Sequence, residues 1–490
     1  MARTINLIDV TLRDAHQCLW ATRMTTAMMK DIAPRLDRTG FEAIDLVGGA
    51  VFDVCVRFLR EDPWERMRIL SSWITETPLI IHTRGQSLFT FEFFADDVVE
   101  LAAERFAANG MRYHTPYDAL NDMRNLEIPI RAAKQHGLYV VGGLVYTHSP
   151  VHTDAYFANK AKDLIKLGVD AVFLKDASGL LLPERIATLV PAVKKAIGKM
   201  PLQIHTHCNS GLAPYVVLQA VEHGVDVVHT ATSTLANDVS HSPTELVATN
   251  LRRRGHDVPV DLAFIEEVAE RLAYIAAREG KPVGSPREYD EFHYHHQCPG
   301  GMVSNLAFQL ETMGLDGRLE EILDEAGHVR ADLGYPIVVS PFAQYIVTQA
   351  ILNVMGKDQG KERYETVPDE VRLYVRGGYG EIAGKIDANL YDKITRGTEP
   401  ITERPGALVE PALERLRKTR GPFMSDDDLL LAAFYDVTQY SALKDAGPIK
   451  TNSPIMETPL LTLVKEITGR PSVKSFHLSI PASQPSKQVS

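Results

Sequence analysis

The chain of 490 residues is long enough for two or three domains with large buried cores. Its formal net charge of −11 argues against a general binder of nucleic acids or of anionic membranes. No apolar run approaches the roughly 20 residues that a membrane helix needs, and the opening MARTINLIDVTLRD shows no signal-peptide pattern. The four cysteines lie far apart without a CxxC spacing, which predicts no disulfide framework. We therefore expect a cytoplasmic protein without a membrane span.

Short runs typical of β-strands alternate with amphipathic helical stretches from residue 4 to about residue 240. Eight such runs can be distinguished, at residues 4–10, 42–47, 78–83, 111–115, 139–145, 171–175, 202–206 and 225–230. The helical stretches between them include residues 96–110 and 156–168, the second ending in Gly168, a common helix stop. This alternation predicts an α/β fold, a (β/α)8 TIM barrel. A doubly wound sheet is the alternative, but no glycine-rich phosphate turn follows the first strand.

The pattern changes near residue 300, where helical stretches such as LEEILDEAGHVRADLG and SPFAQYIVTQAILNVMG begin to dominate. We predict a TIM-barrel domain at residues 1–300 and a mainly helical C-terminal domain at residues 301–470. The last residues, 471–490, are polar and contain serine and proline, which predicts a flexible tail.

In a barrel of this kind, functional groups gather at the C-terminal ends of the strands. The seventh predicted strand ends in IHTHCNSG, where His205 and His207 would point to the same side because side chains alternate along a strand. Together with Asp14, at the end of the first strand, they could form a divalent-metal site of nitrogen and oxygen ligands. An HxH pair alone is more often structural, and the carboxylate at the same rim is what favours a metal.

Lys175 closes the sixth predicted strand and is unexpected there, because a metal ion repels a neighbouring cation. A buried lysine readily becomes neutral, and a neutral amine can take up carbon dioxide to form a carbamate, an anionic oxygen ligand. The alternative is an ordinary ion pair of Lys175 with Asp176 or Asp14. The residues alone leave both interpretations open.

Arg13 and Arg84 also lie at the ends of predicted strands. Guanidinium groups bind carboxylates through two hydrogen bonds, so two of them at one rim suggest a small organic acid as substrate. Gln17, Asp118 and Asn121 could position a carbonyl or a metal-bound water, or could cap helices.

Long stretches from about residue 5 to residue 445 resemble a known family. They include LRDAHQCLWATRM, GGAVFDVCVRFLREDPWERMR, TRGQ, YDALND, LKDASG, HTHCNSG, SHSPTE and CPGGMVSNL. The sequence is similar to the biotin-dependent carboxyltransferases of the pyruvate/oxaloacetate type. These are the carboxyltransferase domain of pyruvate carboxylase, the oxaloacetate decarboxylase alpha subunit and the pyruvate-side subunit of transcarboxylase, and the last looks closest.

The resemblance implies an enzyme that moves a carboxyl group between biotin and a 2-oxo acid, with pyruvate and oxaloacetate as the expected pair. It implies one divalent metal, Zn, Co or Mn, that stabilises an enolate as a Lewis acid. The implied metal ligands are Asp14, His205, His207 and a carbamylated Lys175. Arg13, Gln17 and Arg84 align with residues that bind the 2-oxo acid in the family.

Several positions depart from the family pattern. Val-Gly-Gly at residues 47–49 replaces the usual Trp-Gly-Gly, and YHTPYD replaces a strand end that usually carries an arginine, with His114 nearby. Cys208 follows the HTH motif where Asp or Ser is usual. Because these changes surround the substrate rather than the metal, the reaction class is better supported than pyruvate as the acceptor. Ser240 is the available hydroxyl after strand eight that could carry the proton at biotin.

No Ala-Met-Lys-Met biotinylation motif occurs in the chain. We therefore expect biotin on a separate carrier protein, a biotin carboxylase or second carboxyltransferase subunit as a further partner, and a homodimer or larger assembly. The alternatives are the same chemistry on another enolisable acid, a metal-dependent lyase or Claisen-type condensing enzyme, and an inactive scaffold subunit. Metal content would distinguish the enzymes from a scaffold, and dependence on biotin would distinguish a carboxyltransferase from a lyase.

Overall fold

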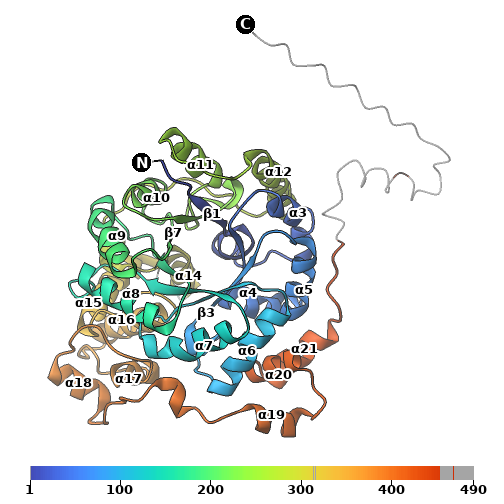
Figure 1. Ribbon diagram of the computed structural model, residues 1–490. Helices are drawn as coiled ribbons and strands as arrows, with labels where there is room; N and C mark the ends of the chain where they lie inside the picture. The colour runs from blue at the N-terminus through green and yellow to red at the C-terminus, as the bar shows by residue number, and fades with distance from the viewer. Residues whose placement is uncertain (1, 313, 315, 453–466, 468–490) are drawn as a thin grey trace.

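Eight parallel strands form the centre of the molecule (Figure 1). The computed structural model describes residues 2–312, 314, 316–452 and 467. Each strand pairs with the next, and β8 pairs with β1, so that the sheet closes into a barrel. The strands are β1 (Asn6–Asp9), β2 (Ala43–Val47), β3 (Leu79–Thr83), β4 (Tyr113–Pro116), β5 (Tyr139–Val145), β6 (Ala171–Asp176), β7 (Leu202–Thr206) and β8 (Val227–Thr230). All eight overlap the predicted ranges, and the predicted barrel is confirmed.

Helices follow the strands and cover the outside of the barrel. They are α1 (His16–Leu19), α2 (Thr26–Met29), α3 (Ala33–Asp37), α4 (Gly49–Val54), α5 (Pro63–Trp73), α6 (Asp96–Ala108), α7 (Glu127–Gln135), α8 (Asp154–Leu167), α9 (Pro183–Ile197), α10 (Ala213–Glu222), α11 (Thr244–Arg253), α12 (Leu262–Glu279) and α13 (Phe292–His296). The ends of α8 illustrate the local rules: the Thr153 side chain caps its first turn by accepting from Tyr156 N, and Gly168 ends it with a φ of 87°.

Short π-helical and 3-10 segments connect these elements. The π-helical segments are η1 (Thr11–Ala15) and η2 (Cys55–Leu59). The 3-10 segments are η3 (Gly85–Ser87), η4 (Met123–Leu126), η5 (Ser233–Leu235), η6 (Asp316–Arg318) and η7 (Pro405–Leu408). Segment η1 directly follows β1 and carries two of the predicted site residues, Arg13 and Asp14.

The C-terminal region is helical, as predicted. Its helices are α14 (Gly300–Thr312), α15 (Leu319–Asp332), α16 (Phe342–Asp358), α17 (Asp369–Val375), α18 (Ala388–Thr395), α19 (Leu413–Arg420), α20 (Asp426–Phe434) and α21 (Val437–Asp445). Throughout the described part of the chain, no helix is both long and apolar enough to span a membrane.

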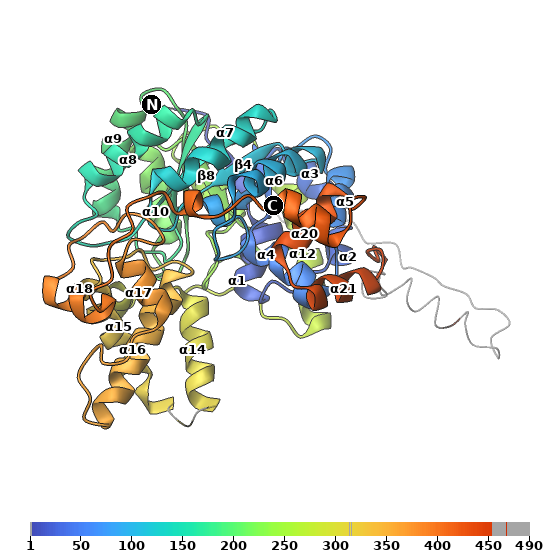
Figure 2. The same cartoon turned by 90° about the horizontal axis from the view of Figure 1, so that it is seen from below.

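The C-terminal helices use two different hydrophobic cores. Ile322 and Val329 of α15 and Ile346 of α16 belong to a cluster that also includes Val145 at the end of β5. Helices α20 and α21 instead join the barrel core, for example through Leu430, and Figure 2 shows them beside α5, away from α14–α18. The predicted boundary after residue 300 falls at the start of α14, and the predicted tail lies outside the described residues. The division into domains stays a prediction.

Candidate metal and substrate site

Asp14 lies at the centre of a buried cluster at the C-terminal ends of the strands. It sits on the π-helical segment η1, a type of turn that is frequent at functional sites. Thr11 anchors this turn by donating its backbone N–H and its hydroxyl to Asp9, at 3.0 and 2.6 Å. Burial alone would raise the pKa of Asp14, but Arg13 and His207 outweigh it and bring this pKa well below its ordinary value. Asp14 is therefore an anion at neutral pH.

Both histidines of the HTH motif face Asp14. The Nε2 atoms of His205 and His207 lie 3.0 and 3.3 Å from Asp14 Oδ2. Burial, followed by the charge of Lys175, lowers the pKa of His205 well below its ordinary value, so its ring is neutral, as a metal ligand must be.

A third histidine, His241, completes the cluster and was not among the predicted ligands. It lies in the loop after β8, and its Nε2 is 3.0 Å from Asp14 Oδ2. The candidate ligand atoms of Asp14, His205, His207 and His241 all lie within 4.8 Å of one another. The stretch SHSPTE contains His241, but its place beside Asp14 depends on an antiparallel bridge between His207 and His241 that the sequence does not reveal.

The hydrogen bonds of the cluster fit a divalent cation. His207 Nδ1 lies 2.8 Å from the carbonyl oxygen of Val239, which only accepts, so Nδ1 donates to it. The other nitrogen, Nε2, faces a carboxylate oxygen of Asp14, and a cation bound between them would hold these two atoms together. His241 differs, because its Nδ1 has no hydrogen-bond partner among the described residues.

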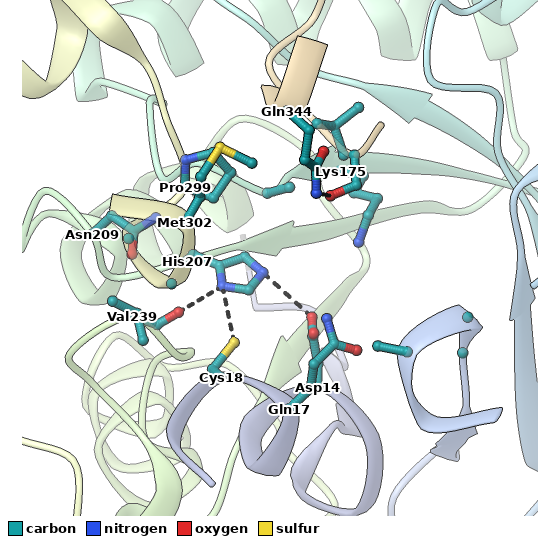
Figure 3. A pocket seen from close by; sticks show the side chains of 18 of the residues that line it. Asp14, Gln17, Cys18, Lys175, His207, Asn209, Val239, Pro299, Met302 and Gln344 are labelled. Carbon is teal, nitrogen blue, oxygen red and sulfur yellow. Dashed lines mark hydrogen bonds and ion pairs between the residues drawn. The ribbon is translucent and has the colours of Figure 1, made fainter. Parts of the chain in front are cut away.

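Lys175 projects from the end of β6 toward the same cluster (Figure 3). It is 5% exposed, and its Nζ lies 3.4 Å from His205 Nε2. Burial lowers its pKa, against the opposing effect of Asp14, which favours a neutral amine. Asp176 accepts from Leu180 N, Leu181 N and the Thr206 hydroxyl, and Lys175 forms no ion pair with any carboxylate of the described residues. The ordinary ion pair considered from the sequence is therefore absent there.

The two predicted arginines differ in what they contact. Arg13 is engaged by two carboxylates, with NH1 2.9 Å from Asp14 Oδ1 and Nε donating to Asp45 Oδ2 at 2.8 Å. Arg84 donates from NH1 to the carbonyl oxygen of Phe89 at 2.8 Å, and its buried Nε has no partner among the described residues. No carboxylate of the described residues pairs with Arg84.

The two glycines after β2 make room for these arginines. A Cβ at Gly48 would lie 3.0 Å from Arg13 Cδ, and a Cβ at Gly49 would overlap the Arg84 guanidinium. The Gly-Gly pair of the motif therefore has a steric reason: it lets both side chains cross the rim of the barrel.

A cavity of about 630 Å³ joins these groups (Figure 3). Six of the predicted residues line it: Arg13, Asp14, Gln17, Arg84, Lys175 and His207. His205 does not line it, and neither does Ser240, which is fully buried and whose hydroxyl has no partner among the described residues. Among the described residues, those with a hydroxyl that line the cavity are Tyr117, Ser340 and Thr348.

Asp118 and Asn121 have structural contacts. Asp118 accepts from the backbone N–H groups of Leu120 and Asp122, and Asn121 exchanges two hydrogen bonds with the backbone of Val145. Asp118 thus holds the turn before η4, and Asn121 holds the end of β5, so neither side chain caps a helix through these contacts. A second possible metal-binding group lies on the surface and consists of His295, Asp324 and His328.

Comparison with known proteins agrees with this architecture. The sequence matches a family profile described as a conserved carboxylase domain over residues 294–466 and one described as HMGL-like over residues 113–272. A pyruvate carboxylase subunit of Methanocaldococcus jannaschii is 39% identical, covering 95% of this chain and 83% of that protein. The methylmalonyl-CoA carboxyltransferase 5S subunit of Propionibacterium freudenreichii is 33% identical, covering 88% of this chain and 86% of that protein.

Two further comparisons bear on substrate and fold. The 2-oxoglutarate carboxylase large subunit of Hydrogenobacter thermophilus is 35% identical, covering 88% of this chain and 67% of that protein. The carboxyltransferase domain of Rhizobium etli pyruvate carboxylase superposes with a TM-score of 0.84 at 27% identity, covering 92% of this chain and 78% of that chain.

A parallel barrel with a polar rim and a helical C-terminal region is the architecture of a carboxyltransferase, and the predicted class is confirmed. The chain belongs to the family of biotin-dependent carboxyltransferases that includes the Methanocaldococcus pyruvate carboxylase subunit and the 5S subunit. Of these two, the pyruvate carboxylase subunit is the more similar to this chain, whereas the motifs alone favoured the transcarboxylase subunit. The carboxylase-domain match covers the helical region that the lyase alternative lacks.

Proposed function

We propose that the chain moves a carboxyl group between biotin on a separate carrier protein and a 2-oxo acid, most simply between oxaloacetate and pyruvate. One observation carries the proposal: Asp14 and His207 line the same cavity as Arg84, a cation without a carboxylate partner among the described residues. The names of the relatives, which include a pyruvate and a 2-oxoglutarate carboxylase, support a 2-oxo acid as the acceptor.

Arg84 and Gln17 would hold the carboxylate of the 2-oxo acid. Arg84 is half-buried, lines the cavity and has no carboxylate partner among the described residues, so its guanidinium is available to a carboxylate ligand. Arg13 already contacts Asp14 and Asp45, so its main part would be to orient Asp14 toward the substrate.

The donor set fits a divalent metal, Zn, Co or Mn, held by Asp14, His205, His207 and a carbamylated Lys175. When bound, the metal supplies a Lewis acid that polarises the ketone of the substrate and stabilises its enolate. The neutral amine of Lys175 would form a bond to the carbon of CO2 and release one proton to water, which leaves an anionic carbamate. Because the Nδ1 of His241 has no partner among the described residues, His241 is better suited to donating from Nε2 to Asp14 than to binding the metal.

Ser240 remains a proposal for the hydroxyl that carries the proton at biotin. Its support is its position next to His241, but its side chain does not line the cavity. Tyr117 does line it, with its ring 5.4 Å from Lys175 Nζ. Measuring biotin-dependent turnover of Ser240→Ala and Tyr117→Phe would decide between these two hydroxyls. Only the variant that lacks the proton carrier should lose this turnover.

Three of the relatives are themselves named as subunits, of a pyruvate carboxylase, a methylmalonyl-CoA carboxyltransferase and a 2-oxoglutarate carboxylase, which supports a multi-subunit enzyme. We propose as partners a biotin carrier protein and either a biotin carboxylase or a second carboxyltransferase subunit, with the chain itself in a homodimer or larger assembly. The four cysteines are unpaired, which suits a reducing cytoplasm.

The experiment that tests the function is decarboxylation of oxaloacetate by the purified protein, with and without free biotin. We expect biotin-stimulated release of pyruvate that is lost in Lys175→Ala, with metal content measured in parallel. A His328→Ala background removes the exposed group on α15 from the metal count. If metal binds but no pyruvate appears, the acceptor is wrong, and carboxylation of 2-oxoglutarate is tested next. If Lys175→Ala is fully active, the mechanism is wrong.

A further inference from the structure

Beneath the cavity, a chain of hydrogen bonds runs through the barrel interior to His205. His205 Nδ1 lies 3.3 Å from His229 Nδ1, and His229 Nε2 lies 3.1 Å from Gln203 Oε1. Gln203 and His205 are two residues apart on β7, and His229 lies on the neighbouring β8, so all three side chains point into the barrel. Each is at most 1% exposed, and none of the three lines the cavity. The function proposed above gives Gln203 and His229 no part.

The direction of these hydrogen bonds determines which nitrogen of His205 is free. The carbonyl oxygen of Gln203 only accepts, so His229 carries its proton on Nε2 and presents Nδ1 as an acceptor. His205 must then carry its proton on Nδ1, and its Nε2 keeps the lone pair that faces Asp14. This is the tautomer that a metal ligand bound through Nε2 requires.

The surroundings hold the ring of His229 in place. The ring is only 1% exposed, with one nitrogen facing His205 and the other facing Gln203. Phe173 stacks on it with ring centroids 4.9 Å apart, which holds the ring plane. Gln203 directs its Oε1 toward this ring, and its Nε2 has no partner among the described residues.

We propose that Gln203 and His229 are positioning residues that fix the tautomer and the ring orientation of His205 for metal binding. This inference rests on the proposed function, since it needs His205 as a ligand. Nδ1 of His207 lies 2.8 Å from the backbone carbonyl of Val239, which no side-chain substitution removes, and 3.7 Å from the Cys18 sulfur. Of the two HTH histidines, His205 is therefore the one whose Nδ1 contacts side chains alone.

The test measures Co²⁺ and Zn²⁺ affinity of the purified protein by chelator competition, together with the visible absorption of the Co²⁺ form. His229→Phe keeps an aromatic ring but removes the acceptor, and we expect its metal affinity to fall by roughly 10- to 100-fold, the usual effect of removing such a partner. Gln203→Met has nearly the same shape without the oxygen and should show a smaller loss. Gln203→Glu keeps an acceptor oxygen and should restore affinity to within about threefold of the wild type.

A matched control is His114→Phe, which also replaces a buried barrel histidine but one whose Nε2 contacts the Thr83 hydroxyl. His114→Phe should bind metal as tightly as the wild type does. A lower metal affinity in both His114→Phe and His229→Phe would therefore indicate a general packing defect. If His229→Phe does not fold, the Gln203→Met and Gln203→Glu pair decides. Equal affinity in these two, or unchanged affinity in a folded His229→Phe, would overturn the inference.

The wild type and His205→Ala separate this inference from the proposed function. Tight metal binding by the wild type that is lost in His205→Ala supports His205 as a ligand whatever the positioning variants do. If the wild type and His205→Ala bind metal equally weakly, the proposed metal site itself is wrong. A second readout is histidine ¹⁵N NMR of the Zn²⁺ form, where Nδ1–H of His205 is expected in the wild type and a mixed signal in Gln203→Met.

Discussion

The two walls of the cavity differ in origin and in chemistry. The inner wall comes from the barrel and is charged: it contains Arg13, Asp14, Gln17, Arg84, Tyr117, Lys175 and His207. The outer wall comes from α14, α16 and the segment before α16, and is mainly apolar with amide groups: it contains Met302, Leu306, Gln309, Gln344, Val347 and Ile351. From this difference we expect the inner wall to carry the chemistry and the outer wall to fit a larger uncharged group, such as biotin.

The largest effect is expected at Lys175. Lys175→Ala would remove the proposed carbamate and with it a metal ligand. Carboxyl transfer should then fall by at least about a thousandfold, since a Lewis acid contributes several kcal/mol to enolate stabilisation. Metal content should fall with it, while circular dichroism stays unchanged. Steady-state decarboxylation measures the loss of activity, and metal analysis measures the loss of metal.

The same variant offers a sharper test, because a small carboxylate can enter the space that the side chain leaves. Added formate or acetate should restore part of the activity of Lys175→Ala, and should not restore Lys175→Arg, whose side chain fills that space. Activity of Lys175→Arg equal to that of the wild type would contradict the carbamate.

Arg84→Ala tests the substrate side of the inner wall. Loss of a charged hydrogen bond to the substrate carboxylate should weaken binding by about 1.5–3 kcal/mol, which is roughly 10- to 150-fold in kcat/KM. Arg84→Lys keeps the charge but not the planar guanidinium group, so its kcat/KM should lie between that of the wild type and that of Arg84→Ala. Unchanged KM and kcat in Arg84→Ala would remove this residue from the site.

Gly49→Ala tests whether the glycine pair exists to admit Arg84. The added methyl group would overlap the guanidinium, so KM for the 2-oxo acid should rise about tenfold, because small misplacements of a positioning group are costly. The control is Gly301→Ala in the same cavity, where an added Cβ meets nothing within 4 Å. Equal kinetics of the two variants would show that the space around Gly49 is not needed.

The barrel and the inner wall could largely be predicted from the sequence, because both follow from local patterns. Strand periodicity located all eight strands, and an i, i+2 spacing at a strand end placed His205 and His207 toward Asp14. His241 could not be found in this way, since it reaches Asp14 through a contact between the loops after β7 and β8. The outer wall was also missed, because it depends on how α14 and α16 fold back over the barrel.

The stability of the metal-free protein should depend on pH through the buried histidines. Burial lowers the pKa of His16 and of His114 to about 3, so between pH 7.5 and 5.5 the unfolded chain takes up protons there that the folded chain does not. The same direction holds for other buried histidines: His82, His152, His229, His293 and His296. Asp9 and Asp118 act in the opposite direction, because burial raises their pKa to about 7 and about 6, but they are fewer.

The unfolded state therefore binds more protons in this window, and the free energy of unfolding should fall as the pH falls below about 6.5. Denaturant titrations at pH 7.5, 6.5 and 5.5 measure it. His114→Phe removes one such group and should flatten the dependence by up to about 1.4 kcal/mol per pH unit. A rise in stability toward pH 5.5 would show that the two carboxyls dominate.

The smallest effect is expected on the outer wall, and it decides whether the two walls act separately. Met302 of α14 lines the cavity, and Met302→Ala removes apolar contact without touching a charged group, so KM for free biotin should rise about two- to fivefold. KM for oxaloacetate should not change, because its carboxylate is held by the inner wall. Phe308→Ala on the same helix is the control, since Phe308 is 69% exposed and does not line the cavity. If Met302→Ala raised both KM values equally, the walls would act as one site, and assigning biotin to the outer wall would be wrong.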